Sequence, residues 1–390
     1  MDRDEIKNSR VEAIGKGGYG IVFEENKAIF IPYVIEGELI SYKIEKKKSS
    51  VWFGKLLDII ESSEFRVTPI CKHYGQCGGC NFQHIAYNHQ LKLKRKILEN
   101  NLKKIAKLKK TPNIKIFSSE KSNSYRTKVN FKVRDGKIGF FKRNSNILEE
   151  IENCIIAGKR ANLLLKELKR KKIIKNTVNG ELLILTNGNE VSSVLLRENK
   201  KFFITDKREI EFKLRGFKYL FTPFNFIQAN LYNLELMIKL LEDEIGNGGD
   251  NASDIFSGAG FFTIPLGKKF NKVFSYELDS ENLKIQRKNL SLNNIKNVKI
   301  ISGNIFSKGK LLESEFIVVD PPRGGLMKKT IEKIVSISPL KIIYFSCDSA
   351  TFSRDIYYFK ERGYLMKKLF LIDNFPHSDH FEIFSVLQKN

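Results

Sequence analysis

The second half of this 390-residue chain alternates short apolar runs with segments of helical character, and this alternation restricts the possible folds more than any other feature. The runs are ASDIFS, KVFSYEL, VKIISG, EFIVVD, KIIYFS and GYLMKKLFLI. Strands that alternate with helices form a parallel, doubly wound sheet. From about residue 215 onward we therefore expect an α/β domain of this kind. The last run, HFEIFSVLQ, follows its neighbour without a helix and is predicted to be an antiparallel edge strand.

A glycine-rich loop follows the first of these predicted strands. The stretch SDIFSGAGFFTIPLG is typical of a strand, then Gly258-Ala259-Gly260, then a helix, and such a loop lets a ligand approach the backbone. Glu277 ends the next apolar run, where a carboxylate can accept hydrogen bonds from ribose hydroxyls. NAD and S-adenosylmethionine both suit this arrangement. The third glycine of a pyrophosphate site is missing, which favours S-adenosylmethionine because this cofactor carries no phosphate.

A second loop with recognisable chemistry follows the fourth predicted strand. FIVVDPPRGG places Asp320 at the tip of the strand, and two prolines keep the following chain extended. Enzymes that methylate base amino groups have an aromatic residue after a similar Pro-Pro pair. Arg323 stands at that place, which disfavours N-methylation of adenine. A plain strand-to-loop turn is the alternative interpretation of this stretch.

Cys347 is the only cysteine in the second half of the chain and follows the predicted strand KIIYFS. The parallel topology places it at the sheet edge that also carries Gly258, Glu277 and Asp320. A thiolate that adds to C6 of a uracil makes C5 nucleophilic enough to take a methyl group. A base must then remove the C5 proton, and Glu382 is our candidate, because its apolar neighbours would raise its pKa. A buried core thiol is the alternative role for Cys347.

The other four cysteines lie in the first half of the chain. Cys71, Cys77 and Cys80 fall within the string CKHYGQCGGC, and Cys154 follows far downstream. Four thiolates can hold a zinc ion or an iron-sulfur cluster. A single C-x2-C pair with a remote fourth cysteine fits the cluster better than the paired knuckles of zinc sites. Disulfides are disfavoured, because we expect a cytoplasmic protein.

Composition and charge indicate a polyanionic partner. The net charge is +24, from 68 Lys and Arg against 44 Asp and Glu, and basic residues dominate the stretch between Lys92 and Lys115. Such concentration fits phosphate contacts, although a lysine-rich codon bias would produce a similar composition. The N-terminus MDRDEIKNSR is polar, and no apolar run approaches the ~18 residues of a membrane span. We expect no membrane association.

The first half of the chain divides into two regions of different character. Residues 11 to 60 contain four or five short β-rich runs, which suggests an OB-like barrel that either binds nucleic acid or is purely structural. Residues 88 to 110 predict an amphipathic helix with a basic face, ended before Pro112. Residues 123 to 214 predict an α+β region, with a helix over 160 to 170 and strands near 181 to 186 and 191 to 196.

Taken together, CxxxxxCGGC, FNFIQAN, DIFSGAGFFT, VVDPPRGG, FSCDSATFSRD and FPHSDHFE resemble the RNA uracil-C5 methyltransferases, and more narrowly the branch that acts on 23S ribosomal RNA. The resemblance spans almost the whole chain. It implies an OB-like TRAM domain over residues 1–62, a central iron-sulfur and RNA-binding domain over 63–214, and a class I, Rossmann-like methyltransferase domain over 215–390. The helix over 88–110 is a candidate to dock on this last domain.

The resemblance also implies roles for individual residues. Cys347 would be the nucleophile and Glu382 the proton acceptor, on a uridine flipped out of its stack. The four early cysteines would hold a 4Fe-4S cluster. The remaining expectations assign residues to S-adenosylmethionine or to RNA. Those for the cofactor are Gln228, Phe256, Gly258, Gly260, Phe261, Glu277, Asn304 and Asp320, and those for RNA are Arg126, Lys128 and Arg323. Phe256 and Phe261 stand where relatives often carry polar or tyrosyl groups.

Three alternatives to a 23S rRNA enzyme stay open at this point. Some cluster-bearing relatives modify tRNA. A chain of this fold could also serve as an inactive RNA-binding or assembly factor. A cytosine-C5 methyltransferase uses the same thiol addition, but neither PPRGG nor SCDS resembles its Pro-Cys nucleophile. No obligate protein partner is inferred.

Overall fold

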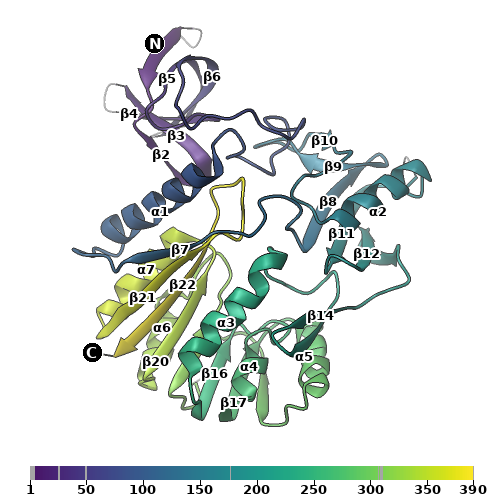
Figure 1. The fold of residues 1–390 in the computed structure, drawn as a ribbon, viewed down its shortest axis with the longest axis vertical. Helices are drawn as coiled ribbons and strands as arrows, with labels where there is room; N and C mark the ends of the chain where they lie inside the picture. The colour runs from purple at the N-terminus through teal and green to yellow at the C-terminus, as the bar shows by residue number, and fades with distance from the viewer. Residues whose placement is uncertain are drawn as a thin grey trace. The chain divides into compact units, whose positions relative to one another are not determined.

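A computed structural model describes residues 5–24, 27–48, 51–175, 177–305, 307 and 311–389 (Figure 1). The chain forms two compact units, and segments distant in sequence contribute to each. Unit 1 comprises Met1–Ile97, Gly139–Ile151 and Phe375–His380, and unit 2 comprises Leu98–Ile138, Glu152–Asn374 and Phe381–Asn390. Within the described residues, no helix has both the length and the apolar character that a membrane crossing requires. The division into three domains stays a prediction.

Unit 1 is built on a six-stranded sheet with the order β1-β5-β6-β4-β3-β2. Alternate side chains such as Val22, Ile29 and Ile31 are buried in one apolar core, as expected for strands with one solvated face. The short strands predicted over residues 11–60 are present, while the assignment to an OB-like TRAM barrel stays a prediction. The strands are β1 (Ile6–Arg10), β2 (Ala13–Ile14), β3 (Tyr19–Glu24), β4 (Lys27–Pro32), β5 (Leu39–Lys48) and β6 (Val51–Glu61), with a 3-10 turn η1 (Lys16–Gly18) between β2 and β3.

Helix α1 (Tyr87–Lys104) ends earlier than the predicted helix over 88–110. Lys107 takes a left-handed φ of 51°, and the amide of Leu108 donates to the carbonyl of Leu102 at 3.3 Å. The left-handed residue and this long-range bond fold the chain back onto the last turn of the helix. The basic residues beyond Lys104 therefore follow the helix instead of extending it.

The middle of the chain contains the predicted α+β elements. Strands β8, β11, β12 and β13 pair in that order, all antiparallel, and α2 packs on β11. The helix predicted over 160–170 and the two predicted strands lie within about a residue of their observed positions. The elements are β8 (Lys128–Arg134), α2 (Lys159–Arg170), β11 (Gly180–Thr186), β12 (Val191–Arg197), β13 (Lys200–Phe203) and the hairpin β14 (Ile210–Leu214) and β15 (Phe217–Phe221). Strand β9 (Lys137–Phe141) pairs with β10 (Leu148–Glu150).

Unit 2 carries an eight-stranded sheet with the order β18-β17-β16-β19-β20-β22-β21-β7. Strands β16 to β20 are parallel, and the strand order reverses between β16 and β19, as in a doubly wound fold. The strands are β16 (Gly249–Ile255), β17 (Phe270–Glu277), β18 (Val298–Ser302), β19 (Phe316–Val319), β20 (Lys341–Ser346), β21 (Tyr364–Ile372), β22 (Glu382–Lys389) and β7 (Ile114–Phe117). The prediction of a mixed α/β fold with a parallel sheet is confirmed.

Helices between these strands cover the sheet (Figure 1). Met237 and Leu241 of α3 and Leu266 of α4 join a buried cluster with Val318 and Phe384 of the sheet. Helices α6 and α7 pack against each other. The helices are α3 (Leu234–Ile245), preceded by η2 (Leu231–Asn233), then α4 (Thr263–Gly267), α5 (Ser280–Leu292), α6 (Met327–Ser336) and α7 (Ser349–Lys360).

The last strand differs from its predicted place. Strand β22 is antiparallel, as expected, but it pairs with β20 on one side and β21 on the other, so the prediction of an edge strand is wrong. Its residues from Glu382 to Leu387 are all buried, which suits an interior strand covered on both faces. The edge beyond β21 is occupied by β7, a four-residue segment that the sequence analysis did not identify.

Candidate active site

Most of the predicted site residues lie at one edge of the sheet of unit 2. Glu277 is the last residue of β17, and the loops after β16, β18, β19 and β20 carry Gly258, Asn304, Asp320 and Cys347, respectively. The carboxyl ends of parallel strands meet at the same edge, and ligands of doubly wound folds bind there. The alternation of strands and helices predicted this placement.

The loop after β16 has the backbone conformation that its glycines allow. Gly258 and Gly260 have φ values of 55° and 87°, and Phe256 also adopts a left-handed φ of 65°. The amide of Gly258 donates to Oε2 of Glu277 at 2.7 Å, while Oε1 of Glu277 accepts from the amides of the two residues that follow it. Glu277 therefore joins the ends of β16 and β17, and its carboxylate faces the loop on which Phe261 also lies.

A network of buried side-chain hydrogen bonds lies against this loop. The side-chain amide of Gln286, on α5, donates to the hydroxyls of Ser275 at 2.7 Å, Ser257 at 2.9 Å and Thr263 at 3.2 Å. A Cβ at Gly260 would lie 3.0 Å from the Cγ atom of Gln286, so the loop packs closely on this side chain. Gln286 is fully buried. This residue could not be predicted, because nothing in its local sequence marks a helical glutamine as buried.

Asp254 extends the network toward the site. The hydroxyl of Thr263 donates to its Oδ2 at 2.6 Å, and within the described chain its Oδ1 is buried without a hydrogen-bond partner. Burial, reinforced by the charge of Glu277, raises the pKa of Asp254 to about 7, against the lowering effect of the Thr263 bond. Asp254 was not predicted as a site residue, although its place near the end of a strand beside the glycine loop was a usable signal.

Asp320 and Gln228 come together as neighbours. The side-chain amide of Gln228 donates to Oδ2 of Asp320 at 3.0 Å, and the amide of Asp320 donates to the carbonyl of Ile255 at 3.3 Å. Gln228 is itself held by the hydroxyl of Thr127, which donates to its backbone carbonyl at 3.0 Å. Burial, with the nearby charge of Asp254, raises the pKa of Asp320 to about 7. The FNFIQAN and VVDPP motifs thus meet at the sheet edge.

Cys347 lies between β20 and α7. The next residue, Asp348, caps α7 by accepting from the amides of Ala350 and Thr351 at 3.1 and 2.9 Å, which fixes the chain on the helical side of the thiol. Cys347 is partly exposed. Burial raises the pKa of the Cys347 thiol to about 12, the negative charges of Glu382 and Asp320 add to this rise, and Arg323 opposes it.

The sheet register brings Glu382 beside Cys347. Strand β20 pairs with β22 through Ser346 and Ile383, so the next position on the two strands is occupied by Cys347 and Glu382. Glu382 is 1% exposed, and its Oε1 finds no hydrogen-bond partner among the described residues. Burial, with the charge of Asp320 as the second cause, raises the pKa of Glu382 well above its ordinary value. A carboxylate in this setting is a strong proton acceptor.

The predicted RNA contacts occupy different surroundings. Arg126 borders a pocket of about 590 Å³ that Lys121 and Lys159 also line, and within the described residues its buried Nε lacks a partner. Lys128 donates to the carbonyl of Asn225 at 2.9 Å, and burial lowers its pKa to about 8. The carbonyl of Arg323 accepts from the hydroxyl of Thr351 at 3.0 Å.

The predicted cluster ligands belong to both units, with Cys71, Cys77 and Cys80 in unit 1 and Cys154 in unit 2. The thiol of Cys77 accepts from the amide of Gly79 at 3.3 Å, as metal-bound cysteines often do. Nevertheless, no set of three or more Cys, His, Asp or Glu side chains in the described part of the chain is arranged to hold a metal ion. The 4Fe-4S cluster stays a prediction.

Comparison with known proteins gives a consistent result. The profile of a family described as tRNA (uracil-5-)-methyltransferase matches residues 194–308 and 308–390. An uncharacterized RNA methyltransferase of Aquifex aeolicus is 29% identical over 99% of this chain and 99% of its own length. The 23S rRNA (uracil(1939)-C(5))-methyltransferase RlmD of Vibrio campbellii is 27% identical over 98% of this chain and 95% of its own.

One solved structure has a similar fold over nearly the whole chain. It is the tRNA (uracil-54, C5)-methyltransferase of Pyrococcus abyssi in complex with S-adenosyl-L-homocysteine. The TM-score is 0.78 at 22% identity, over 97% of this chain and 99% of that one. At this identity the likeness concerns the fold.

Proposed function

This chain belongs to the tRNA (uracil-5-)-methyltransferase family, and from that premise we propose that it methylates C5 of a specific uridine in 23S ribosomal RNA through a covalent bond between Cys347 and C6 of the uracil. Family membership makes the chain an S-adenosylmethionine-dependent RNA uracil-C5 methyltransferase. The choice of RNA and the roles of the individual residues are the proposal. The observation that carries it is the register of β20 and β22, which brings Cys347 next to Glu382.

Each catalytic group has a defined part in this mechanism. The sulfur of Cys347 adds to C6, which turns C5 into an enolate-like carbon that takes the methyl group from a sulfonium donor. The carboxylate of Glu382 then accepts the proton from C5, and the bond between sulfur and C6 breaks to release methylated uridine. The high pKa of the Cys347 thiol keeps it protonated at rest, so its proton passes to water as the substrate binds and the sulfur adds to C6 as the thiolate.

The sheet edge offers a suitable place for S-adenosylmethionine, which supplies the methyl group when bound. We assign the backbone around Gly258 and Gly260 to the approach of the cofactor, and the carboxylate of Glu277 to its ribose hydroxyls. Asp320 and Gln228 form a hydrogen-bonded pair that can meet its polar groups. The remaining proposed cofactor contacts are Phe256, Phe261 and Asn304.

Ribosomal RNA is the preferred substrate because two Vibrio relatives, 27 and 28% identical to this chain, are named 23S rRNA (uracil(1939)-C(5))-methyltransferase. The solved tRNA enzyme is less similar in sequence. Arg126, Lys128 and Arg323 are the proposed RNA contacts, and a cytoplasmic location follows from an RNA substrate of this kind. We keep tRNA as the second candidate substrate.

A 4Fe-4S cluster bound by Cys71, Cys77, Cys80 and Cys154 is part of the proposal. It is supported by the spacing of the cysteines and takes no part in the methyl-transfer steps. Iron and acid-labile sulfide, measured in protein purified without oxygen, test it. We expect about four of each per chain, and their absence would remove the cluster from the proposal.

The decisive experiment replaces the nucleophile. Anaerobically purified protein is given labelled S-adenosylmethionine with unmodified 23S rRNA or unmodified tRNA, and the methylated position is mapped. We expect Cys347→Ala to abolish transfer and to leave cofactor affinity within about twofold, because the thiol is required for chemistry rather than for cofactor binding. Ser336→Ala, at the exposed end of α6, is the matched control. Methyl transfer by Cys347→Ala would contradict the mechanism, and labelling of tRNA alone would change the substrate.

A further inference from the structure

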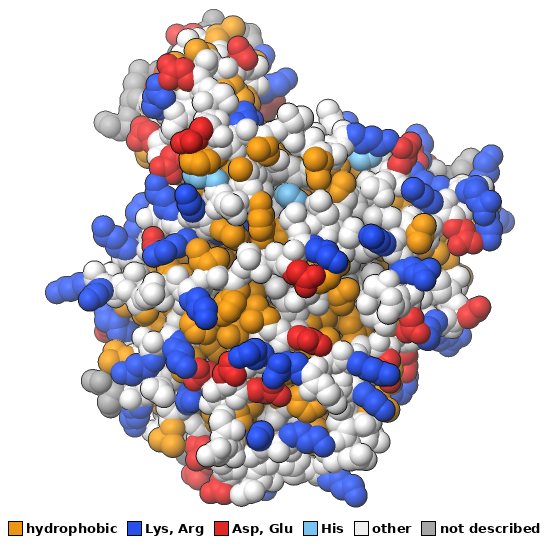
Figure 2. Space-filling view, in the orientation of Figure 1, with side chains coloured by type: hydrophobic (Ala, Val, Ile, Leu, Met, Phe, Trp, Pro, Cys, Tyr) orange, Lys and Arg blue, Asp and Glu red, His pale blue; other side chains and the backbone are white. Residues whose placement is uncertain are grey.

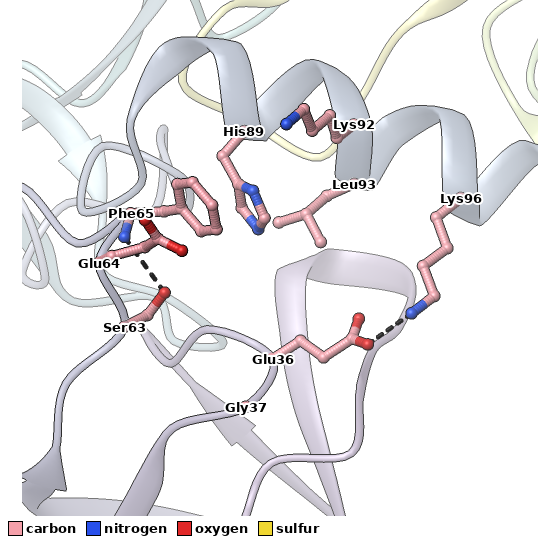
Figure 3. Close-up of a pocket in the computed structure, with 9 residues that line it drawn as sticks. All are labelled: Glu36, Gly37, Ser63, Glu64, Phe65, His89, Lys92, Leu93 and Lys96. Atoms are coloured by element: carbon pink, nitrogen blue, oxygen red, sulfur yellow. Dashed lines mark hydrogen bonds and ion pairs between the residues drawn. The ribbon is translucent and has the colours of Figure 1, made fainter.

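Unit 1 contains a pocket that none of the proposed catalytic or cofactor residues lines (Figure 3). It has a volume of about 510 Å³ and lies between the first turns of α1, the segment after β6 and the turn before β5. We call it the Phe65–His89 pocket. The charged, aromatic and apolar side chains that line it include Glu36, Glu64, Phe65, His89, Lys92, Leu93 and Lys96. Its size is in the usual range for small-ligand sites and is sufficient for one nucleotide.

The wall of the pocket is a pair of stacked rings. The rings of Phe65 and His89 lie face to face, with centroids 3.9 Å apart and planes within 9° of each other (Figure 3). Both side chains are partly exposed, and buried Leu93 lies one turn further along the same face of α1. Within the described chain, the buried Nδ1 of His89 has no hydrogen-bond partner, so ring contact rather than hydrogen bonding fixes this atom's orientation.

His89 presents an uncharged ring at neutral pH. Burial, with the positive charge of Lys92 as the second cause, lowers the pKa of His89 below its ordinary value, against the raising effects of Glu36 and Glu64. The face-to-face pair leaves its outer ring faces for a further flat ring, because both side chains are partly exposed. Nucleic acid bases stack on such ring faces whatever their sequence, because every base has a π face.

Positive charge lies at the rim of the same pocket. Lys92 is exposed, and its Nζ lies 5.7 Å from the centroid of the Phe65 ring. Lys96, one turn further on, forms an ion pair with Glu36 across the pocket mouth (Figure 3). Lys92 is therefore the lysine that can contact a phosphate, because the ammonium group of Lys96 is already paired with Glu36. The stacked rings suit the base of a nucleotide, and the accessible ammonium group of Lys92 suits its phosphate.

We propose that the Phe65–His89 pocket binds one unpaired nucleotide of the RNA substrate, with its base on the stacked rings of Phe65 and His89 and its phosphate at Lys92. This inference rests on the proposed function in that the ligand is RNA. It adds a second point of attachment on unit 1, remote in sequence from the residues that carry out the chemistry. A nucleotide held there selects RNA that presents a second single-stranded base besides the target uridine.

Photocrosslinking on the unaltered protein tests the site directly. An unmodified 23S rRNA fragment carries a photoreactive base at each unpaired position in turn, and the linked peptides are identified by mass spectrometry. We expect one position other than the target uridine to link to the peptides that contain Phe65 or His89. If every unpaired position is tried and none links there, the proposal is wrong. Methyl transfer to the same RNA tests the proposed function separately.

Two variants separate the base contact from the phosphate contact. His89→Ala should weaken RNA binding about tenfold without changing its salt dependence, because it removes a stacking surface. Lys92→Gln should weaken binding less and lower the salt slope by about one, because it removes one phosphate contact. The matched control is Lys269→Gln, an exposed lysine before β17, at the other edge of the sheet from the cofactor loops.

Folding is checked by thermal unfolding and cofactor affinity, and both should be unchanged in Lys92→Gln. If His89→Ala fails to fold, Lys92→Gln and the crosslinks decide the matter. RNA affinities of folded variants within twofold of the unaltered protein would overturn the proposal. Methyl transfer at saturating RNA should stay near the unaltered rate, because the pocket contributes to binding and not to the reaction.

Discussion

At the scale of single residues, the site is defined by carboxyl groups with raised pKa values. Glu382 and Asp254 are buried and Asp320 is partly buried, and the pKa of each is raised further by a neighbouring carboxyl group. Such clusters are costly to fold and are found where their chemistry is needed. In our proposal Glu382 supplies the basicity, and the other two set the charge around the bound cofactor.

Replacing Glu382 tests its role as the proton acceptor. Glu382→Gln keeps the size of the side chain but removes the basic oxygen, so methylation of C5 proceeds while release of the product stops. We expect turnover to fall by a factor of about 100 to 10,000. An RNA–protein adduct stable to denaturing electrophoresis should accumulate.

The exposed Glu361→Gln, at the end of α7, is the control for that substitution and should show no adduct. A Glu382→Gln enzyme that turns over at the unaltered rate, or that loses methyl transfer without trapping RNA, would assign proton removal to another group.

The raised pKa of Asp254 predicts how stability depends on pH. In the unfolded chain an aspartate titrates near pH 4, while in the fold its pKa is about 7. The folded state therefore holds the proton more tightly, and the stability from that proton is complete below about pH 4 and is lost as the pH rises through 7. From pH 5 to 8, the cofactor-free protein should lose about 2–3 kcal/mol of unfolding free energy through this group.

Asp254→Asn removes that dependence. Its unfolding midpoint in denaturant should change less between pH 5 and pH 8 than that of the unaltered protein, because an amide does not titrate in this range. The measurement is the difference between the two proteins at each pH, so that other titrating groups cancel. Parallel curves for the two proteins would mean that Asp254 is ionised in the fold.

At the scale of elements, the glycine loop and α5 act together through Gln286. The amide of Gln286 meets three hydroxyls, two of which flank the loop that carries Gly258 and Gly260. Loss of the amide removes a buried hydrogen bond to these hydroxyls, although each keeps another partner, and costs about 1–3 kcal/mol in total. The loop is then free to depart from the backbone conformation that its left-handed residues require.

Gln286→Leu should therefore weaken cofactor binding about tenfold as well as lower the thermal midpoint by several degrees. Calorimetric titration with S-adenosylmethionine and a melting curve measure the two effects. Lys284→Leu, on the exposed side of the same helix, controls for the introduction of leucine into α5. Unchanged cofactor affinity in a destabilised Gln286→Leu would limit this residue to a structural role.

The elements also show where sequence reasoning succeeds and where it stops. The parallel strands were predicted from the apolar runs that start at Ala252, because the length and spacing of such runs are local properties of the sequence. Strand β22 was misplaced because its partners are decided by pairing across the sheet, which local sequence does not encode. Helix α1 was predicted too long because Lys107, which has no intrinsic preference for a left-handed φ, takes that conformation.

The same distinction applies to the site. Glu277, Asp320 and Cys347 lie at strand ends that the topology brings to one edge, so their neighbourhood could be predicted from the sequence. Asp254 and Gln286 were not identified, because their importance depends on burial and on partners from other elements. The stack of Phe65 on His89 likewise joins a loop residue to a helix residue, and no sequence period relates the two.

At the scale of the whole molecule, charge decides between two interpretations of the composition. Lys and Arg side chains are distributed across the face shown in Figure 2, and the net charge is +24. If this surplus reflects a lysine-rich codon bias alone, the lysines contribute little to RNA affinity. If they contact phosphates, binding releases counterions and depends steeply on salt.

The salt dependence of RNA binding distinguishes the two. For an enzyme that makes about six to ten phosphate contacts, the affinity for unmodified 23S rRNA fragments should fall by a factor of about 1,000 or more between 50 and 200 mM salt. S-adenosylmethionine carries no phosphate, so its affinity over the same range serves as the internal control and should change by less than about twofold. Filter binding of RNA and calorimetry of the cofactor give the two curves. A flat RNA curve would mean that the basic surplus does not serve RNA binding, and recognition would then depend on a few base contacts such as those proposed at Cys347 and at the Phe65–His89 pocket.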